Sequence, residues 1–218
     1  CRGVEFTGGG QRWIAHATRE TLLCAGAIGS PQVLQLTGIG PARLLQEHQL
    51  PAVVDSPGVG ENLQDHLQLR MAFKVRGVKT LNTMANSWLG KLKIGLEYAL
   101  NRSGPMSMAP SQLGLFTRSD PSQKSANIQY HVQPLSLNKF GEPLHPFPAF
   151  TASVCNLRPT SRGSIHARSR DANDAPLIET NYLSTPEDRH VAVDAIRVAR
   201  RIAAAPPLAR FRPQEYMP

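Results

Sequence analysis

The sequence predicts a mixed α+β fold, and three observations carry that prediction. Residues 128–132, Ile-Gln-Tyr-His-Val, alternate apolar and polar side chains with the two-residue period of a strand. Residues 185–203 repeat apolar side chains at helical spacing, behind a threonine that can cap a helix. The chain of 218 residues is 41% hydrophobic and 18% charged, which is too apolar for a disordered polypeptide and enough to build a sizeable core.

The first 25 residues predict a hairpin followed by a third strand. Apolar residues alternate over 4–6 and 13–15, on either side of the glycines at 8–10, as in two strands joined by a tight turn. The next segment, residues 20–25, contains a continuous apolar run around two leucines. Such a run indicates a strand that is buried on both faces in the middle of a sheet.

A glycine-rich stretch at residues 24–41 then predicts a loop, a short helix and a stop. Ser30 is a suitable N-cap, Pro31 suits the first helical position, and Gly38 can adopt the left-handed conformation that ends a helix after about two turns. A glycine loop before a helix N-terminus lets a ligand approach the backbone closely. The arrangement is also an ordinary structural connection, and on geometry alone both interpretations stand.

Beyond residue 40 the sequence predicts short elements separated by polar loops. Pro41 opens a second short helix, and residues 51–66 indicate a strand followed by a tight loop. A helix is expected over about 86–101, stopped by Gly104 and Pro105. We expect it to bury one face, made of Trp88, Leu92, Leu96 and Ala99. Further strands are expected at Leu113–Thr117, Ile128–Val132, Phe150–Asn156, Gly163–Arg168 and Leu177–Leu183.

Two of these later segments have a clear polarity. In 127–134 the apolar side chains should face a core, while Gln129, His131 and Gln133 form a polar face directed elsewhere. The clearest helix starts after Thr185, with Glu187 in its first turn, where the helix dipole favours negative charge. Its expected buried stripe is Val191, Ala195, Val198 and Ile202, and Pro206 and Pro207 are expected to end it.

Composition restricts the class of partner. The net charge is +8, yet the one local cluster of arginines, Arg197, Arg200 and Arg201, lies on a single expected helix, which is the usual pattern of a solvated face. We therefore expect no nucleic-acid partner, although a basic nucleic-acid-binding module remains an alternative. No apolar run approaches the roughly 20 residues of a membrane helix.

The three cysteines have no metal-ligand spacing, so no metal site is expected. Cys24 and Cys155 lie in apolar strand patterns and are expected to be buried reduced thiols. With no targeting signal evident, the expected location is cytoplasmic.

Several motifs in order along the chain resemble those of the glucose-methanol-choline (GMC) flavin oxidoreductases. They are GAIGSPQVLQLTGIGP at 26–41, GVGENLQDH at 58–66, NIQYHVQP at 127–134, RPTSRGSIHARSRD at 158–171 and NYLSTPEDRHVAVDAIRVAR at 181–200. The likeness is strongest to choline-dehydrogenase-like bacterial members and spans nearly the whole chain. Several collinear motifs are far more specific than any one of them.

The resemblance implies how the chain is divided and what each part binds. Residues 1–66 would be part of an FAD-binding α/β domain, and residues 67–218 a substrate-binding domain with an antiparallel sheet and helices on one face. The resemblance also implies contacts to FAD from Ala25, Gly26, Ala27, Ser30 and Pro31, the first three approaching its adenosine part.

The substrate side is implied in the same way. Gln112 and His131 correspond to positions that line the alcohol site of choline-oxidising relatives, where a glutamate at the position of Gln112 accompanies the trimethylammonium group. A neutral amide pairs poorly with a buried cation. An uncharged primary alcohol is therefore the expected substrate. Structural roles remain open for both residues.

The resemblance also indicates what the chain leaves out. The chain contains neither the GxGxxG loop that holds the pyrophosphate in the family nor the motif of the family's catalytic histidine. We therefore assign no catalytic residue and expect an internal fragment. We expect the chain alone to bind FAD weakly or not at all and to have no turnover. A stoichiometric yellow complex of the purified chain would contradict this.

Further expectations concern a polar loop, an alternative function and self-association. Asn62, Asp65 and His66 are interpreted as a loop-fixing group rather than as catalysts. Non-oxidative lyase chemistry on the same scaffold is an alternative function, and self-association through apolar surface of residues 1–66 is left open. The electron acceptor and the identity of the alcohol do not follow from the sequence.

Overall fold

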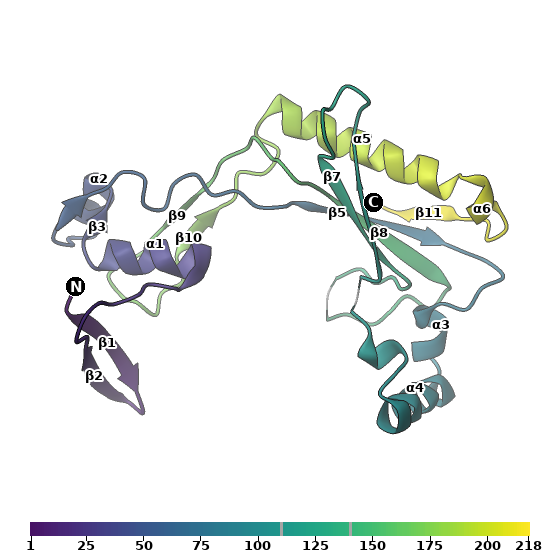
Figure 1. The fold of residues 1–218 in the computed structure, drawn as a ribbon, viewed down its shortest axis with the longest axis horizontal. Coiled ribbons are helices and arrows are strands. Elements are labelled where there is room, and N and C mark those ends of the chain that lie inside the picture. The colour runs from purple at the N-terminus through teal and green to yellow at the C-terminus, as the bar shows by residue number, and fades with distance from the viewer. Residues whose placement is uncertain (110, 140) are drawn as a thin grey trace. The chain divides into compact units, whose positions relative to one another are not determined.

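The computed structural model describes residues 1–109, 111–139 and 141–218, and within them the chain forms two compact units (Figure 1). Unit 1 comprises residues 1–63 and 162–180, and unit 2 comprises residues 64–161 and 181–218. The sequence predicted a single boundary, between residues 66 and 67. Residues 162–180 depart from that division because they pack with helix α1 of unit 1, as described below.

Unit 1 begins with the expected hairpin. Strands β1 (Gly3–Gly8) and β2 (Gln11–His16) pair antiparallel, with Gly8 opposite Gln11. The two turn residues, Gly9 and Gly10, have φ values of +59° and +77°. Both lie in the left-handed region that a two-residue hairpin turn requires, which explains the glycines.

The expected buried strand at residues 20–25 is wrong. This segment has no regular secondary structure, and Leu22 is 75% exposed. Cys24 is exposed as well, whereas Cys155 is buried as expected. An apolar run becomes a strand only where neighbouring strands accept its hydrogen bonds, and among the described residues the sheets do not include this segment.

Two short helices and a small parallel pair form the middle of unit 1. Helix α1 (Gly26–Leu36) is followed by strand β3 (Ile39–Gly40), helix α2 (Ala42–Glu47) and strand β4 (Val54–Asp55). Gly38 ends α1 as expected, with φ of +87°, and a Cβ atom there would lie 2.3 Å from the Pro51 carbonyl oxygen. Any side chain at this position would clash with the backbone.

Residues 162–180 complete unit 1. They contain strands β9 (Ser164–His166) and β10 (Leu177–Glu179), which pair antiparallel, and β9 contacts α1. Gln35 of α1 is fully buried and holds them: its Nε2 donates to the carbonyl oxygens of Val59 and Ile165, both at 3.1 Å, and its Oε1 accepts from the Ala167 amide at 2.7 Å.

Unit 2 is built on a five-stranded sheet whose neighbours all pair antiparallel, in the order β11-β5-β8-β7-β6. This confirms the expected α+β fold with an antiparallel sheet. The strands are β5 (Gln68–Lys74), β6 (Leu113–Thr117), β7 (Ile128–Gln133), β8 (Ala149–Asn156) and β11 (Gln214–Met217).

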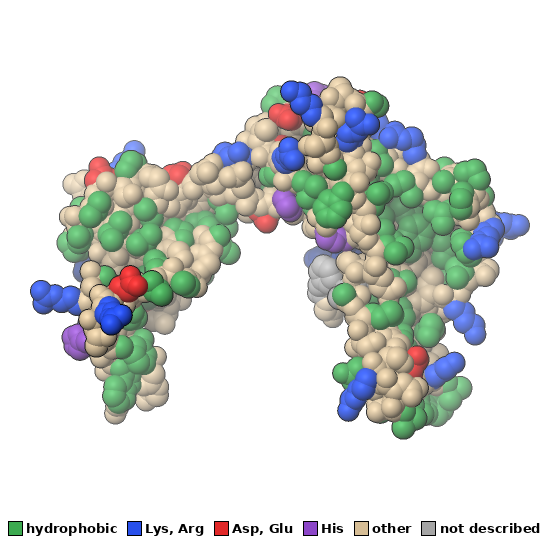
Figure 2. Space-filling model, viewed as in Figure 1, with side chains coloured by type: hydrophobic (Ala, Val, Ile, Leu, Met, Phe, Trp, Pro, Cys, Tyr) green, Lys and Arg blue, Asp and Glu red, His purple; other side chains and the backbone are tan. Residues whose placement is uncertain are grey.

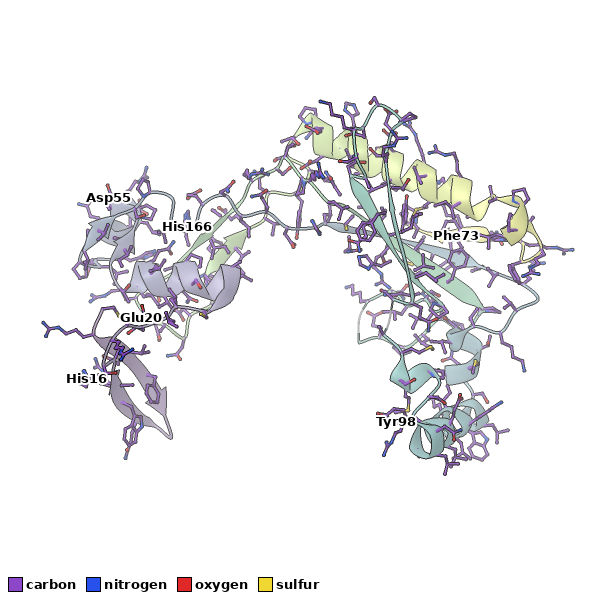
Figure 3. The ribbon with its side chains drawn as sticks, in the orientation of Figure 1. His16, Glu20, Asp55, Phe73, Tyr98 and His166 are labelled. Atoms are coloured by element: carbon purple, nitrogen blue, oxygen red, sulfur yellow. The ribbon has the colours of Figure 1, made fainter. Side chains whose placement is uncertain are left out.

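One face of this sheet carries the core, covered by helix α5 (Pro186–Ala203) (Figure 1). Apolar residues of the central strands, among them Phe73, which Figure 3 labels, pack against the stripe of Val191, Ala195 and Val198. Ile202, expected in that stripe, is 40% exposed. Helix α5 ends at Ala203, shortly before Pro206 and Pro207 as expected, and these two prolines begin a further short helix, α6 (Pro206–Ala209).

The remaining elements of unit 2 are helices α3 (Leu81–Ala85) and α4 (Trp88–Asn101) and the 3-10 turn η1 (Pro105–Ser107). The expected helix is present, but its expected buried face is wrong: Trp88 is 72% exposed, and Leu92 and Leu96 are exposed too, while Ile94 on the opposite side is buried. Figure 2 shows apolar side chains at the surface of α4.

None of the described helices is both long and apolar enough to cross a membrane.

Candidate functional site

The first turn of α1 is the part of unit 1 to which the resemblance assigned cofactor contacts. Ala25, Gly26 and Ala27 are all exposed, and within the described part of the chain no side chain of the N-cap residue caps the backbone N–H groups of this turn. Gly26 has φ of +74°, and a Cβ atom there would meet nothing within 4 Å. Uncapped N–H groups with open space beside them favour a hydrogen-bond acceptor or an anionic group.

Ser30 and Pro31 lie elsewhere than expected. Both are half-buried inside α1, which starts at Gly26 rather than after Ser30. Pro31 cannot donate a hydrogen bond to the carbonyl group of Ala27 four residues earlier. Because Ala27 is exposed, water can satisfy that carbonyl group, so the helix tolerates the proline. The prediction of Ser30 as N-cap is therefore wrong.

The loop at residues 58–66 has structural contacts on each side. In unit 1, Gly60 has φ of +90°, and a Cβ atom there would lie 2.2 Å from the Ile165 carbonyl oxygen. The carboxylate of Glu61 lies 2.8 Å from Nε2 of His166, which Figure 3 labels. In unit 2, Asp65 accepts a hydrogen bond from the Tyr182 hydroxyl group, and Nε2 of His66 lies 3.3 Å from the Leu157 carbonyl oxygen.

The sheet of unit 2 has a polar face opposite the one covered by α5. Side chains of directly paired residues share a face, so the register places Ser153, His131 and Gly114 in one row across β8, β7 and β6. Tyr130, next to His131, points to the opposite face and belongs to the core. The alternation predicted for 127–134 is therefore confirmed.

The two expected substrate residues come from neighbouring strand segments at the β6 edge. His131 is half-buried in β7. Its partner on β6 is Gly114, which has no side chain and so leaves space beside His131. Gln112 is exposed just before β6, where its amide N–H donates to the Val132 carbonyl oxygen at 3.0 Å. Nε2 of Gln112 lies 3.0 Å from the sulfur of Met108, which is a weak acceptor.

A third polar residue of this face, Gln133, was not assigned a role from the sequence. It is 6% exposed and follows His131 by two residues, so both side chains point to the same side of β7. Its Nε2 donates to Ser111 Oγ at 3.2 Å, while its Oε1 has no hydrogen-bond partner among the described residues. Only the period of two along β7 indicated its position.

A buried network lies beyond the end of β7. Asn82 Nδ2 donates to the carbonyl oxygens of Ser136 and His145, at 3.0 and 2.8 Å. The His145 ring bonds Ser136 Oγ through Nδ1 and Asn138 Oδ1 through Nε2. Burial lowers the pKa of His145, as do the positive charges of Arg70 and Lys74. A neutral imidazole that is hydrogen-bonded through both ring nitrogens stabilises the loop after β7.

Among the described residues, no three His, Cys, Asp or Glu side chains lie together as metal ligands would.

Two family models described as GMC oxidoreductase match the chain, one over residues 1–68 and the other over residues 159–218. Curated relatives include the oxygen-dependent choline dehydrogenases of Burkholderia cenocepacia and Burkholderia pseudomallei, each 41% identical to this chain over 216 residues. The match covers 99% of this chain and 38% of each relative. The chain thus spans well under half the length of these enzymes.

Solved structures agree in fold. An FAD-dependent oxidoreductase from Chaetomium thermophilum superposes with a TM-score of 0.85 at 23% identity, over 99% of this chain and 44% of that one. A formate oxidase from Aspergillus oryzae gives a TM-score of 0.87 at 22% identity, over 99% and 42%. At these identities the likeness concerns the fold alone. The two family models and the 41% identity to the curated relatives show that this chain belongs to the GMC oxidoreductase family.

Proposed function

We propose that this chain is part of an FAD-dependent oxidoreductase that oxidises the CH–OH group of an uncharged primary alcohol. The observation that carries the proposal is the polar face of the unit 2 sheet, with an imidazole and a neutral amide at the two positions expected to line the alcohol site. Membership of the GMC family supports the oxidoreductase class, and its members bind FAD.

Unit 1 would contribute to the FAD site through the first turn of α1. Ala25, Gly26 and Ala27 are exposed residues whose backbone N–H groups suit the hydrogen-bond acceptors of the adenosine part, and Gly26 adds no side chain that would block them. Ser30 and Pro31 would act less directly, by shaping the helix behind this turn. When bound, FAD supplies the acceptor for the hydride that leaves the alcohol carbon.

Unit 2 would bind the alcohol. His131 can hydrogen-bond the hydroxyl group through either ring nitrogen, and Gly114 leaves room beside the ring. Gln112 would face the remainder of the substrate with a neutral amide. A buried cation needs a compensating negative charge. This is why an uncharged alcohol is favoured over the quaternary-ammonium substrate that the relatives' name indicates.

A further part of the proposal concerns FAD binding by residues 1–218 on their own. Neither glycine-rich segment, GIGPAR at 38–43 nor GVGENL at 58–63, has the third glycine of a pyrophosphate-binding loop. We therefore propose that residues 1–218 alone bind FAD weakly or not at all.

The nucleic-acid alternative has less support. Within the arginine cluster of α5, Arg197 pairs with Asp194 at 2.9 Å, and Arg200 forms a bidentate pair with Glu215, with both distances 2.8 Å. Arginines already paired with carboxylates offer little to a phosphate backbone.

The substitution Gln112→Glu tests the substrate assignment. In the full-length protein that contains this chain, we expect the variant to bind choline about tenfold more tightly or better, because a carboxylate beside a desolvated cation is worth more than about 1.4 kcal/mol. The apparent dissociation constant is measured from flavin reduction without oxygen at increasing choline concentrations. Gln112→Leu, which removes the amide without adding charge, is the matched control and should show no gain. An unchanged affinity in Gln112→Glu would remove the support for this position.

A further inference from the structure

The side-chain amide of Gln133 is buried, and one of its two ends lacks a hydrogen-bond partner among the described residues. It is 6% exposed, it lies on the same side of β7 as His131, and its Oε1 makes no hydrogen bond within the described part of the chain. The nearest partner on the neighbouring strand, Thr151, donates its hydroxyl group to the Leu135 carbonyl oxygen at 2.7 Å, so it does not donate to Gln133. A buried amide oxygen without a donor is destabilising and rare in folded proteins.

The orientation of the amide does not alter this conclusion. One end of the Gln133 side chain bonds Ser111 Oγ at 3.2 Å. Exchanging oxygen and nitrogen would let the oxygen accept from the serine and would leave the nitrogen without an acceptor. In either orientation one end of a buried amide remains without a partner, on the face of the sheet that also carries His131.

Ser111 and Gln112 extend this polar group. Both lie just before β6, beside the end of β7, where the amide N–H of Gln112 bonds the Val132 carbonyl oxygen. Among the described residues, the side-chain amide of Gln112 has only the thioether sulfur of Met108 as its partner. Two neutral amides and a serine hydroxyl group therefore come from the end of β7 that follows His131 and from the segment just before β6. A hydroxyl group, which both donates and accepts, satisfies either orientation of Gln133.

We propose that Ser111, Gln112 and Gln133 form a hydrogen-bonding subsite beside His131 that holds a second hydroxyl group of the alcohol, so that the substrate is a small diol or polyol. The inference rests on the proposed function and adds the class of alcohol. A site whose buried amide needs a hydroxyl partner discriminates strongly against an analogue that lacks it, because the amide is then left unsatisfied.

The test compares 1,2-propanediol with 1-propanol, which differ only in the second hydroxyl group. Flavin reduction without oxygen is followed in the full-length protein as a function of alcohol concentration, which separates the apparent dissociation constant from the limiting rate. We expect the wild-type protein to bind the diol more tightly. In Gln133→Leu the affinity for the diol should fall about tenfold or more, while the affinity for 1-propanol is unchanged or higher.

Gln129→Leu is the matched control, since it makes the same change on the same face of β7, two residues on the other side of His131. It should not alter the preference for the diol. A second measurement needs no substrate: removing an unpartnered buried amide should leave the Tm of Gln133→Leu unchanged or raise it by about 2–4 °C.

Four results would overturn the inference. Equal losses for both alcohols in Gln133→Leu, or equal affinities for them in the wild-type protein, would remove the diol subsite and leave the proposed function standing. A fall in Tm of several degrees would assign the amide a structural role, with its free end satisfied by water. If neither alcohol reduced the flavin, the proposed function itself would fail, and the inference with it.

Discussion

At the scale of single residues, the structure reveals hydrogen bonds of Asp188 that the sequence cannot show. The sequence places it in the first turn of a helix, where a negative charge is generally favoured. In the structure it is buried, and its carboxylate accepts hydrogen bonds from Asn156 Nδ2, from the amide and hydroxyl groups of Thr160, and from the Ser161 amide. It therefore fixes the segment after β8 to the start of α5.

Asp188→Asn should lower the free energy of unfolding by about 2 kcal/mol at neutral pH, because hydrogen bonds to a charged acceptor are lost. Burial alone would raise the pKa of Asp188, but the hydrogen bonds from Ser161 and Thr160 outweigh it and hold that pKa below its usual value. The wild-type advantage is therefore full above the unfolded pKa of about 3.9 and is lost as pH falls through the lower folded value.

Urea unfolding of both proteins at a series of pH values checks this prediction. An advantage of the wild-type protein that stays constant down to the lowest pH would show that the charge of Asp188 does not carry the effect.

Residues that depend on partners distant in the sequence could not be assigned from it. Gln35 bonds groups up to 132 residues away, and Gln133 is notable only because its buried oxygen lacks a partner. Local patterns placed His131 on the polar face, because strand alternation alone decides that.

At the scale of elements, α5 was predicted well because its signals are local. Thr185 is the N-cap, and its Oγ1 accepts from the Asp188 amide at 3.2 Å, while Pro186 occupies the first helical position. The N-cap residue of helix α1, Ala25, has no capping side chain, and the start of this helix was misplaced by five residues. Helix α4 shows a different limit, since periodicity says which residues share a face but not which face meets the core.

Thr185→Ala should lower the free energy of unfolding by about 1 kcal/mol, because it leaves the Asp188 amide without its capping acceptor. The Thr185 hydroxyl group also bonds Thr160 Oγ1 at 2.6 Å, which adds to the loss. Guanidinium denaturation followed by far-UV circular dichroism measures the change. Thr185→Ser keeps the hydroxyl group and should stay close to wild type; equal losses in the two variants would argue against the cap.

At the scale of the whole molecule, the two compact units do not correspond to two continuous stretches of sequence. Unit 1 is assembled from two separate stretches, and the buried side chain of Gln35 joins them. A pattern read along the chain cannot show that residues 162–180 return to the first unit, because no local signal distinguishes them from the strands of unit 2. Local patterns predicted three strands of the unit 2 sheet, β6, β7 and β8, but not β5 and β11, which complete it.

The central claim is that the polar face of the unit 2 sheet binds an uncharged alcohol whose hydride is transferred to FAD in the full-length protein. Mixing that protein, loaded with FAD and freed of oxygen, with an uncharged primary alcohol such as 1,2-propanediol tests it most directly. The account predicts loss of the yellow flavin absorbance with saturation in alcohol, and much slower or weaker reduction in His131→Ala. A flavin that stays oxidised with uncharged alcohols but is reduced readily by choline would contradict it.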